Sequence, residues 1–394
     1  MMRRDSMAAL VEELREAGMR MPDFGNSNLE VARELLRADS GKLIGRRRNK
    51  VVMIIDGMGR DLASRVLYGN GSASGYAKWL NMRPITTVFP STTINALSSF
   101  YSGEAPASHG VIATKIPFKE AGMIVNTLAF SAGIDTNMRL RYVDPRGLYA
   151  RPRTIEALSR RGGFTSLMHE AILGTGLSST AFVKEEMVPF VSFDDMFLAA
   201  ARLVKKRVRH IFVYYDLVDH EQHVYSPAVE EPRAALHSIF ASMHRLLRPV
   251  LEDSDYDFII TADHGQVRIE HRNTTQIHPD DELMGLLSNA PWGERRALFM
   301  SVEDGKEARF EDYAGRVFGK RAIVVRSDEA IRSGLFGGRP PDALRYRFGT
   351  HMVLPRNGYA IHYNYPGSLG THGNLGGHGG LSSDEMEVPL LTNF

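Results

Sequence analysis

Apolar residues recur with two different periods along the chain. Over residues 1–40 and again over residues 230–250 they return every three or four positions, which predicts amphipathic helices. Three shorter segments are rich in apolar, β-branched and aromatic residues: VVMII (51–55), HIFVYY (210–215) and DFIIT (257–261). Such segments are typical of strands that are buried on both faces of a parallel sheet.

The alternation of these strands with helical segments predicts an α/β fold. We expect a doubly wound, mostly parallel sheet with helices on both faces. Residues 285–345 differ, with two short apolar runs, a charged helical stretch and the Gly/Pro-rich sequence GLFGGRPP. We interpret them as a small α/β insertion that could cap a site. The core domain would then comprise residues 1–284 and 346–394.

The amino-acid composition is that of a globular protein and excludes several kinds of site. The chain has 394 residues, of which 43% are hydrophobic and 24% charged, as in soluble globular proteins. The formal net charge of +2 gives no electrostatic reason to expect a nucleic-acid or membrane partner. Cysteine is absent, which excludes disulfides and thiolate zinc sites. The first residues lack the apolar core of a signal peptide and no apolar run is long enough to span a bilayer, so we expect a cytoplasmic protein.

Each of the three predicted strands runs directly into acidic or imidazole side chains. The residues concerned are Asp56 after the first strand, Asp216, Asp219, His220 and His223 after the second, and Asp263 and His264 after the third. Ligands bind beyond the carboxyl ends of the strands in open α/β sheets, so parallel strands would bring these groups together. Asp219 and His223 are four residues apart and would share one helical face. Each piece alone is an ordinary turn or surface feature, but together they indicate a site for zinc or manganese.

A nucleophile candidate lies in the segment VFPSTTINALSSFYSG (88–103). Residues 93–102 are predicted to form a helix that ends at Gly103. Thr92 and Thr93 would lie at its N-terminus, where unpaired backbone N–H groups and the helix dipole favour an anion. Threonine is also an ordinary helix cap, so this segment alone does not define a catalytic site.

The order of these motifs resembles the type I phosphodiesterase/nucleotide pyrophosphatase branch of the alkaline phosphatase superfamily. The matching features are, in chain order, Asp56, Pro-Ser-Thr-Thr at 90–93 with Ser-His-Gly at 108–110, Asp219 with His223, Asp263-His264-Gly265 and Gly377-His378-Gly379. The resemblance covers residues 50–270 and 345–390.

This resemblance implies an alkaline phosphatase-like fold that holds two adjacent divalent metal ions, with Zn²⁺ expected and Mn²⁺ as the alternative. The implied ligands are Asp56, Asp263, His264 and the Thr93 hydroxyl for one ion, and Asp219, His223 and His378 for the other. Thr93 occupies the position of the family's nucleophile, which attacks phosphorus and forms a phosphothreonine intermediate.

The segment THGNLGGHGG (371–380) is rich in glycine, and the implied ligand role of His378 gives those glycines a reason, since they let the backbone approach the site. His372 matches no motif position, and we interpret it as a loop histidine. The chain also departs from the family. Members carry an asparagine that contacts the phosphate, shortly after the Ser-His-Gly. This sequence has Thr114 at that place, and Lys115, which follows, could take over the contact through its positive charge.

The leading hypothesis is a metal-dependent phosphodiesterase or pyrophosphatase that acts on a small-molecule phosphate diester or nucleotide. A phosphomonoesterase or a phosphonate hydrolase would use the same two-metal site, and the missing asparagine leaves this choice open. A non-catalytic protein that binds a phosphorylated ligand is the alternative from another class. The sequence gives no reason to expect specific nucleic-acid binding, and it does not determine the oligomeric state.

Overall fold

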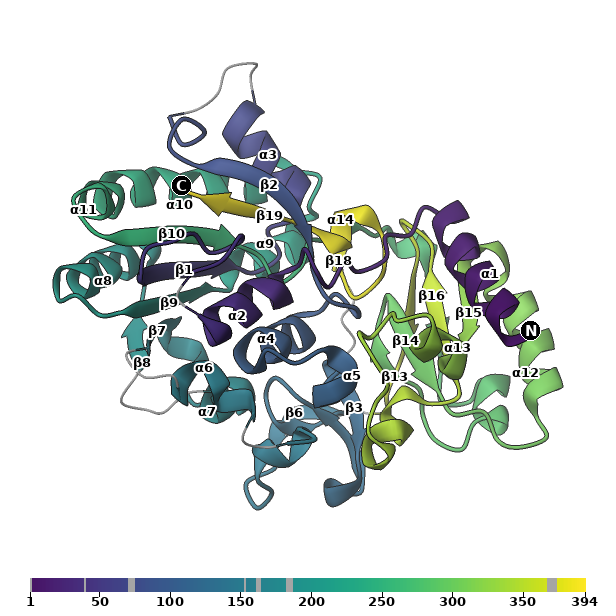
Figure 1. Cartoon of the computed structure of the whole chain (residues 1–394). Helices are drawn as coiled ribbons and strands as arrows, with labels where there is room; N and C mark the ends of the chain where they lie inside the picture. The colour runs from purple at the N-terminus through teal and green to yellow at the C-terminus, as the bar shows by residue number, and fades with distance from the viewer. Residues whose placement is uncertain are drawn as a thin grey trace.

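A seven-stranded sheet forms the centre of the larger lobe. The computed structural model describes residues 2–394 apart from 39, 70–74, 152–153, 161–163, 182–186 and 367–373 (Figure 1). The strands lie in the order β2 (Asn81–Thr86), β19 (Glu387–Thr392), β10 (Tyr256–Thr261), β1 (Asn49–Ile55), β9 (His210–Tyr215), β7 (Phe164–His169) and β8 (Met187–Phe190). The three strands expected from the sequence are thus adjacent at the centre of the sheet.

The sheet is parallel from β10 to β8, and only β19 runs antiparallel to its neighbours. Every residue of β9 and β10 is buried, which explains why both read as nearly continuous apolar runs. The predicted fold class, a mostly parallel sheet in an α/β protein, is confirmed.

Helices cover the sheet in two groups. One group contains α2 (Asn28–Arg37), α4 (Thr93–Ser102), α5 (Pro106–His109), α6 (Ala157–Arg160) and α7 (Gly176–Ala181). The other contains α3 (Arg60–Tyr68), α8 (Phe193–Lys205), α9 (Leu217–Tyr225), α10 (Glu230–Leu246) and α11 (Arg248–Glu252). Figure 1 draws α2 and α4 in front of the sheet.

The predicted helices are present, with one interruption. Ser27 caps α2, because its side chain accepts a hydrogen bond from the backbone N–H of Glu30. The helix expected over residues 230–250 ends at Leu246, and α11 begins two residues later. Pro249 lies in the first turn of α11. Proline has no backbone N–H to donate to the preceding turn, so the long helix cannot continue through it.

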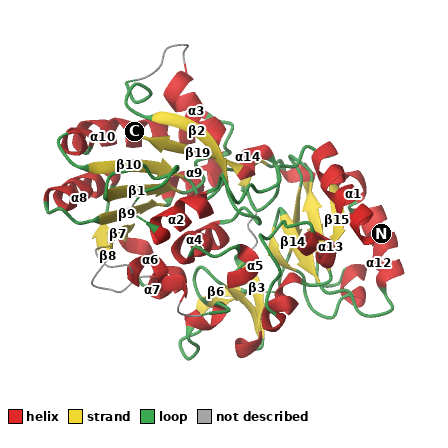
Figure 2. Ribbon diagram, in the orientation of Figure 1, coloured by secondary structure: helices red, strands yellow, loops and turns green. Residues whose placement is uncertain are grey.

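A second lobe is built on a four-stranded antiparallel sheet (Figure 2). Its strands lie in the order β13 (Trp292–Glu294), β14 (Ala297–Met300), β16 (His351–Pro355) and β15 (Ala322–Arg326), accompanied by α12 (Glu307–Val317) and α13 (Ser327–Arg332). α1 (Met2–Glu16) contacts α13. The domain division at 285–345 stays a prediction; the sheet itself continues past residue 345, because β16 pairs with both β14 and β15.

Smaller sheets lie near the junction of the lobes, and the sequence pattern did not predict them. One contains β3 (Lys115–Phe118), β4 (Met123–Asn126), β5 (Ser131–Ala132) and β6 (Asp135–Arg139). The others pair β11 (Val267–Arg268) with β18 (Gly376–Gly377) and β12 (Thr274–Ile277) with β17 (Ala360–Tyr363). Strands of two to five residues are too short to show a period. Among the described residues, no helix is long and apolar enough to cross a membrane.

A buried ion pair joins the second lobe to the C-terminal segment of the chain. Arg296, in the turn between β13 and β14, donates to Glu385 of α14 (Ser383–Met386) through Nε at 3.0 Å and Nη2 at 2.8 Å. Glu385 also accepts from the backbone N–H of Gly380 at 2.8 Å. Both charged side chains are fully buried. The pair therefore fixes the loop that carries His378.

We predict that Arg296→Met lowers the free energy of unfolding by about 3–5 kcal/mol, because it leaves the Glu385 carboxylate buried without its partner. Urea unfolding followed by circular dichroism measures the loss. Arg316→Met is the matched control, since the Arg316–Glu282 pair is exposed and its loss should leave the free energy of unfolding close to the wild-type value. Equal losses in the two variants would contradict the structural role of the buried pair.

Candidate active site

The parallel strands deliver their polar residues to one edge of the sheet. Asp56 follows β1, Asp219 lies in α9 directly after β9, and Asp263 follows β10. These strands are neighbours in the order β10, β1, β9. The convergence expected from the sequence is therefore present, and it comes from the rule that parallel strands end at a common edge.

The first cluster surrounds the hydroxyl of Thr93. Thr93 Oγ1 lies 3.1 Å from His264 Nε2 and 3.4 Å from Asp56 Oδ2. His264 Nε2 lies 3.5 Å from Asp56 Oδ1 and 3.4 Å from Asp263 Oδ2. The four residues named from the sequence for one metal ion thus meet in a single buried group.

The second cluster contains Asp219, His223 and His378. His223 Nε2 lies 3.3 Å from Asp219 Oδ2, and His378 Nε2 lies 3.9 Å from Asp219 Oδ1. Asp219 also groups with Asp56 and His264, with ligand atoms within 4.8 Å of one another. The two clusters are therefore contiguous, and Asp219 lies between them. Its membership in both was not expected from the sequence.

The three histidines are oriented by backbone carbonyl groups. Nδ1 of His264 lies 3.1 Å from the carbonyl oxygen of Gly265, and Nδ1 of His223 lies 3.1 Å from that of Gly376. Nδ1 of His378 lies 3.2 Å from the carbonyl oxygen of Ser91. A proton on each Nδ1 donates to the carbonyl group and leaves the Nε2 lone pair facing the carboxylates. This arrangement is common among metal-binding histidines.

The carboxylates are short of positive charge. Oδ1 of Asp56 and Oδ2 of Asp263 are buried and accept no hydrogen bond from any described residue. Burial and the neighbouring carboxylates raise the pKa of Asp56 well above its usual range, and burial raises the pKa of Asp263 to about 6. Divalent cations would relieve both the desolvation and the repulsion.

Two of the three histidines are suited to bind such cations at neutral pH, whereas Asp219 raises the pKa of the third, His223. Burial lowers the pKa of His264 and of His378 to about 4, so both rings are neutral at pH 7. A neutral imidazole has a lone pair for a metal ion, whereas a protonated one has none. Carboxylate oxygen and imidazole nitrogen atoms are ligands of zinc and manganese. The donor set therefore fits two divalent metal ions.

Thr93 is the first residue of α4, and the predicted helix over residues 93–102 is confirmed. Gly103 ends the helix with a φ of +70°, which glycine adopts without strain. Thr92, at the N-cap, makes no capping hydrogen bond and instead donates to Glu294 Oε1 at 3.0 Å. The first N–H groups of α4 are thus left free of a side-chain cap beside the Thr93 hydroxyl.

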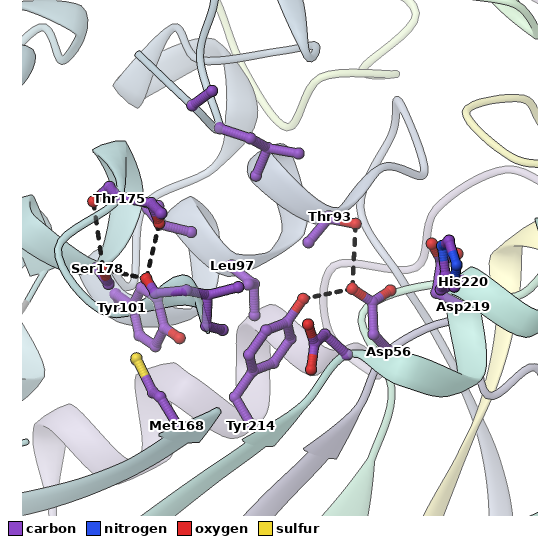
Figure 3. A pocket seen from close by; sticks show the side chains of 15 residues that line it. Asp56, Thr93, Leu97, Tyr101, Met168, Thr175, Ser178, Tyr214, Asp219 and His220 are labelled. Atoms are coloured by element: carbon purple, nitrogen blue, oxygen red, sulfur yellow. Dashed lines mark hydrogen bonds between the residues drawn. The ribbon is translucent and has the colours of Figure 1, made fainter. Parts of the chain in front are cut away.

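Two cavities meet at Thr93 and Asp219, which line both. The first has a volume of about 380 Å³ and a mainly apolar wall that includes Leu97, Met168 and Tyr214 (Figure 3). The second, of about 310 Å³, also has a largely apolar wall, to which Leu128, Leu298 and Ile361 contribute, but it holds more charged and aromatic side chains, and these come from both lobes. We name them the apolar cavity and the charged cavity.

Several side chains at the site were missed by the sequence reading. Tyr214 donates its hydroxyl to Asp56, as Figure 3 shows, and Gln266 donates to the side chain and, at 3.0 Å, to the backbone carbonyl of Asp219. Glu294 reaches the site from the second lobe. Gln266 stands two residues after His264, and that proximity was the available signal. Nothing in the local sequence marks Glu294.

Other candidates fall outside the clusters or outside the described residues. Asp216 and His220 line the apolar cavity but belong to neither cluster. Thr114 donates its backbone N–H to Glu294 at 2.6 Å, and Lys115 lines the charged cavity. His372, interpreted as a loop histidine, lies outside the described residues.

Comparisons with known proteins find a matching family model and similar folds. A family model described as type I phosphodiesterase / nucleotide pyrophosphatase matches residues 50–380. Phosphonoacetate hydrolase from Sinorhizobium meliloti 1021, in complex with phosphonoacetate, aligns with a TM-score of 0.64 at 17% identity, over 89% of this chain and 91% of that one. Murine ectonucleotide pyrophosphatase / phosphodiesterase 5 aligns with a TM-score of 0.60 at 15% identity, over 87% of each chain. An inactive form of the murine protein in complex with AMP aligns with a TM-score of 0.60 at 14% identity, again over 87% of each chain. No curated protein sequence matches.

We predict that Asp219→Asn abolishes the binding of both metal ions, because Asp219 belongs to both clusters, whereas His223→Asn removes one ion only. Inductively coupled plasma mass spectrometry, after dialysis against a zinc buffer, measures metal per chain. Asp216→Asn is the control and should retain the wild-type content. Wild-type metal content in Asp219→Asn would show that Asp219 is not a shared ligand.

Proposed function

The chain belongs to the type I phosphodiesterase/nucleotide pyrophosphatase family, and from this premise we propose that it hydrolyses small-molecule phosphate diesters with Thr93 as nucleophile. The observation that carries the proposal is the position of Thr93 Oγ1. It lies at the N-terminus of α4, within 3.4 Å of both His264 and Asp56. A hydroxyl in this setting can lose its proton and attack phosphorus.

The two clusters would each hold a divalent metal ion, with Zn²⁺ favoured by the three imidazole ligands and Mn²⁺ as the alternative. The ligands would be Asp56, Asp263, His264 and Thr93 in one site and Asp219, His223 and His378 in the other, with Asp219 close to both. Bound ions would lower the pKa of the Thr93 hydroxyl and neutralise charge on the phosphoryl oxygens.

The reaction would proceed in two displacements. The bond from Thr93 Oγ1 to phosphorus forms as the bond to the leaving oxygen breaks; the threonine proton passes to solvent, and the leaving oxygen takes one up. The free N–H groups at the start of α4 hold the phosphoryl oxygens during this step. Water then attacks the phosphothreonine and restores the Thr93 hydroxyl. Tyr214 holds Asp56 in place through its hydrogen bond.

Two cavities favour a diester over a monoester. A monoester has one substituent on phosphorus, whereas a diester has two and could extend one into each cavity that meets at Thr93. The similar murine protein has been solved with AMP, which supports a nucleotide as a substrate class. The similar hydrolase from Sinorhizobium meliloti binds phosphonoacetate, so a phosphonate hydrolase on the same site is the second candidate.

The insertion proposed at residues 285–345 would act as a cap. Glu294 and Arg295, from the end of β13 and the turn that follows, line the charged cavity together with Thr93. A substrate in this cavity would therefore touch both lobes, so the second lobe would help to select the substrate.

We predict that the zinc- or manganese-reconstituted protein hydrolyses bis-p-nitrophenyl phosphate faster than p-nitrophenyl phosphate. The release of p-nitrophenol, measured as kcat/KM, gives the ratio directly. A higher value for the monoester would move the protein to the phosphomonoesterase class. Failure to cleave either ester, at full metal content, would count against hydrolysis of phosphate esters and direct the search to phosphonates or to a non-catalytic role.

We predict that Thr93→Ala lowers kcat for the better ester by roughly 10³-fold or more, because the nucleophile is removed. Its metal content should stay close to that of the wild type, since six carboxylate and imidazole ligands remain. Thr92→Val is the matched control; its hydroxyl donates to Glu294 and does not reach the clusters, so it should stay within about tenfold of the wild type. Near-full activity in Thr93→Ala would remove Thr93 from the mechanism.

A further inference from the structure

The charged cavity brings two cationic side chains to the side of the site that faces the second lobe. Lys115, at the start of β3, and Arg295, in the turn after β13, line it together with Thr93 and His378. Neither cation is a ligand candidate, and the two-displacement reaction uses neither. Two cations at this position could bind an anionic group of the substrate.

Arg295 has hydrogen-bonding capacity that the protein does not use. Its Nη2 donates to Thr274 Oγ1 at 3.3 Å. Its Nε and Nη1 are buried and have no hydrogen-bond partner among the described residues. An unpaired N–H of a buried guanidinium is costly, because it has left water without gaining an acceptor. Because Arg295 lines the charged cavity, a small shift of its side chain would let an anionic group there accept hydrogen bonds from the guanidinium, which pairs well with carboxylate and phosphate.

Lys115 is held against the wall of the same cavity. Its Nζ lies 4.0 Å from the centroid of the Tyr365 ring, a cation–π contact that keeps the ammonium group desolvated on one side. Burial lowers the pKa of Lys115. The ammonium group therefore gains from any further negative charge placed beside it.

Glu294 is the one carboxylate of the charged cavity outside the metal clusters, among the residues that the structure describes. Its Oε1 already accepts from Thr92 Oγ1 at 3.0 Å and from the Thr114 backbone N–H at 2.6 Å. It offsets one of the two cations. The charge that remains favours one additional anionic group in the cavity.

We propose that the charged cavity is a subsite for a second anionic group of the substrate, bound by Arg295 and Lys115. The substrate is then a phosphodiester or phosphoanhydride in which one substituent ends in a carboxylate or phosphate and the other occupies the apolar cavity. This inference rests on the proposed function and deepens it, because it names the chemistry of one substituent. It also assigns to Lys115 and Arg295 a role in specificity that is separate from attack on phosphorus.

Three p-nitrophenyl phosphodiesters that differ in one group test this subsite. Their second substituents are ethyl, 2-carboxyethyl and 2-phosphonoethyl. The metal-reconstituted wild type should show a kcat/KM for one or both anionic esters that is roughly 10–100-fold above that for the ethyl ester, the range expected for charge-assisted hydrogen bonds. The better of the two anionic esters distinguishes a carboxylate from a phosphate as the natural group.

Variants of the cavity assign the preference to its residues. The preference is the ratio of kcat/KM for an anionic ester to kcat/KM for the ethyl ester. Arg295→Gln should bring this ratio close to one, whereas Arg295→Lys should retain part of the preference. Lys115→Met should lower the ratio more than Arg295→Lys does. Arg272→Gln, an exposed arginine outside the cavity, is the control and should keep the wild-type ratio. Circular dichroism checks that each variant is folded.

The outcomes separate this inference from the proposed function. Hydrolysis of the ethyl ester with no preference for the anionic esters, or a wild-type preference in Arg295→Gln, overturns the subsite and leaves the phosphodiesterase intact. If no ester is hydrolysed, the proposed function fails, and calorimetric titration with methylenediphosphonate and methylphosphonate decides the subsite. A tighter Kd for the diphosphonate that is lost in Arg295→Gln supports it, and an equal Kd for the two compounds overturns it.

Discussion

Asp56, Asp219 and Asp263 lie close together at the carboxyl edge of the sheet, and their burial and mutual repulsion are the constraint on which the rest of the site depends. Burial and like charge raise the pKa of Asp56 and of Asp263, whereas the pKa of Asp219 is lowered: burial acts to raise it, but His223, His378 and His264 together outweigh burial. Protonation of a carboxyl group or the binding of a cation relieves the repulsion among three buried carboxylates. The electrostatics of the site therefore suit the binding of divalent cations, independently of any reaction.

The rest of the molecule holds ligands to that cluster from distant parts of the chain. Backbone carbonyl groups orient the three imidazoles, and the buried Arg296–Glu385 pair fixes the loop of His378 from the second lobe. The same turn that supplies Arg296 places Arg295 in the charged cavity. If Arg295 selects the substrate as we propose, one turn between β13 and β14 serves both stability and substrate selection.

Much of this arrangement could be predicted from local sequence. The central strands, the helix of residues 93–102 and the polar residues at the strand ends depend on apolar periodicity and on the geometry of parallel sheets, and each is present. The shared position of Asp219, the contact of Tyr214 with Asp56 and the entry of Glu294 and Arg295 could not be predicted in this way. They depend on how segments far apart in sequence pack, and no local spacing encodes such packing. Pro249 was a local signal that the helix ends before it, but the apolar period continues across this position and hid the signal.

The central claim is that Thr93 takes up the phosphoryl group before water does. The stereochemical course at phosphorus tests it most directly, with one stereoisomer of a chiral phosphorothioate diester hydrolysed in heavy-oxygen water. Two successive in-line displacements, first by Thr93 and then by water, each invert the configuration, so the account predicts net retention. Net inversion would mean that water attacks the substrate in a single step, and it would contradict the account.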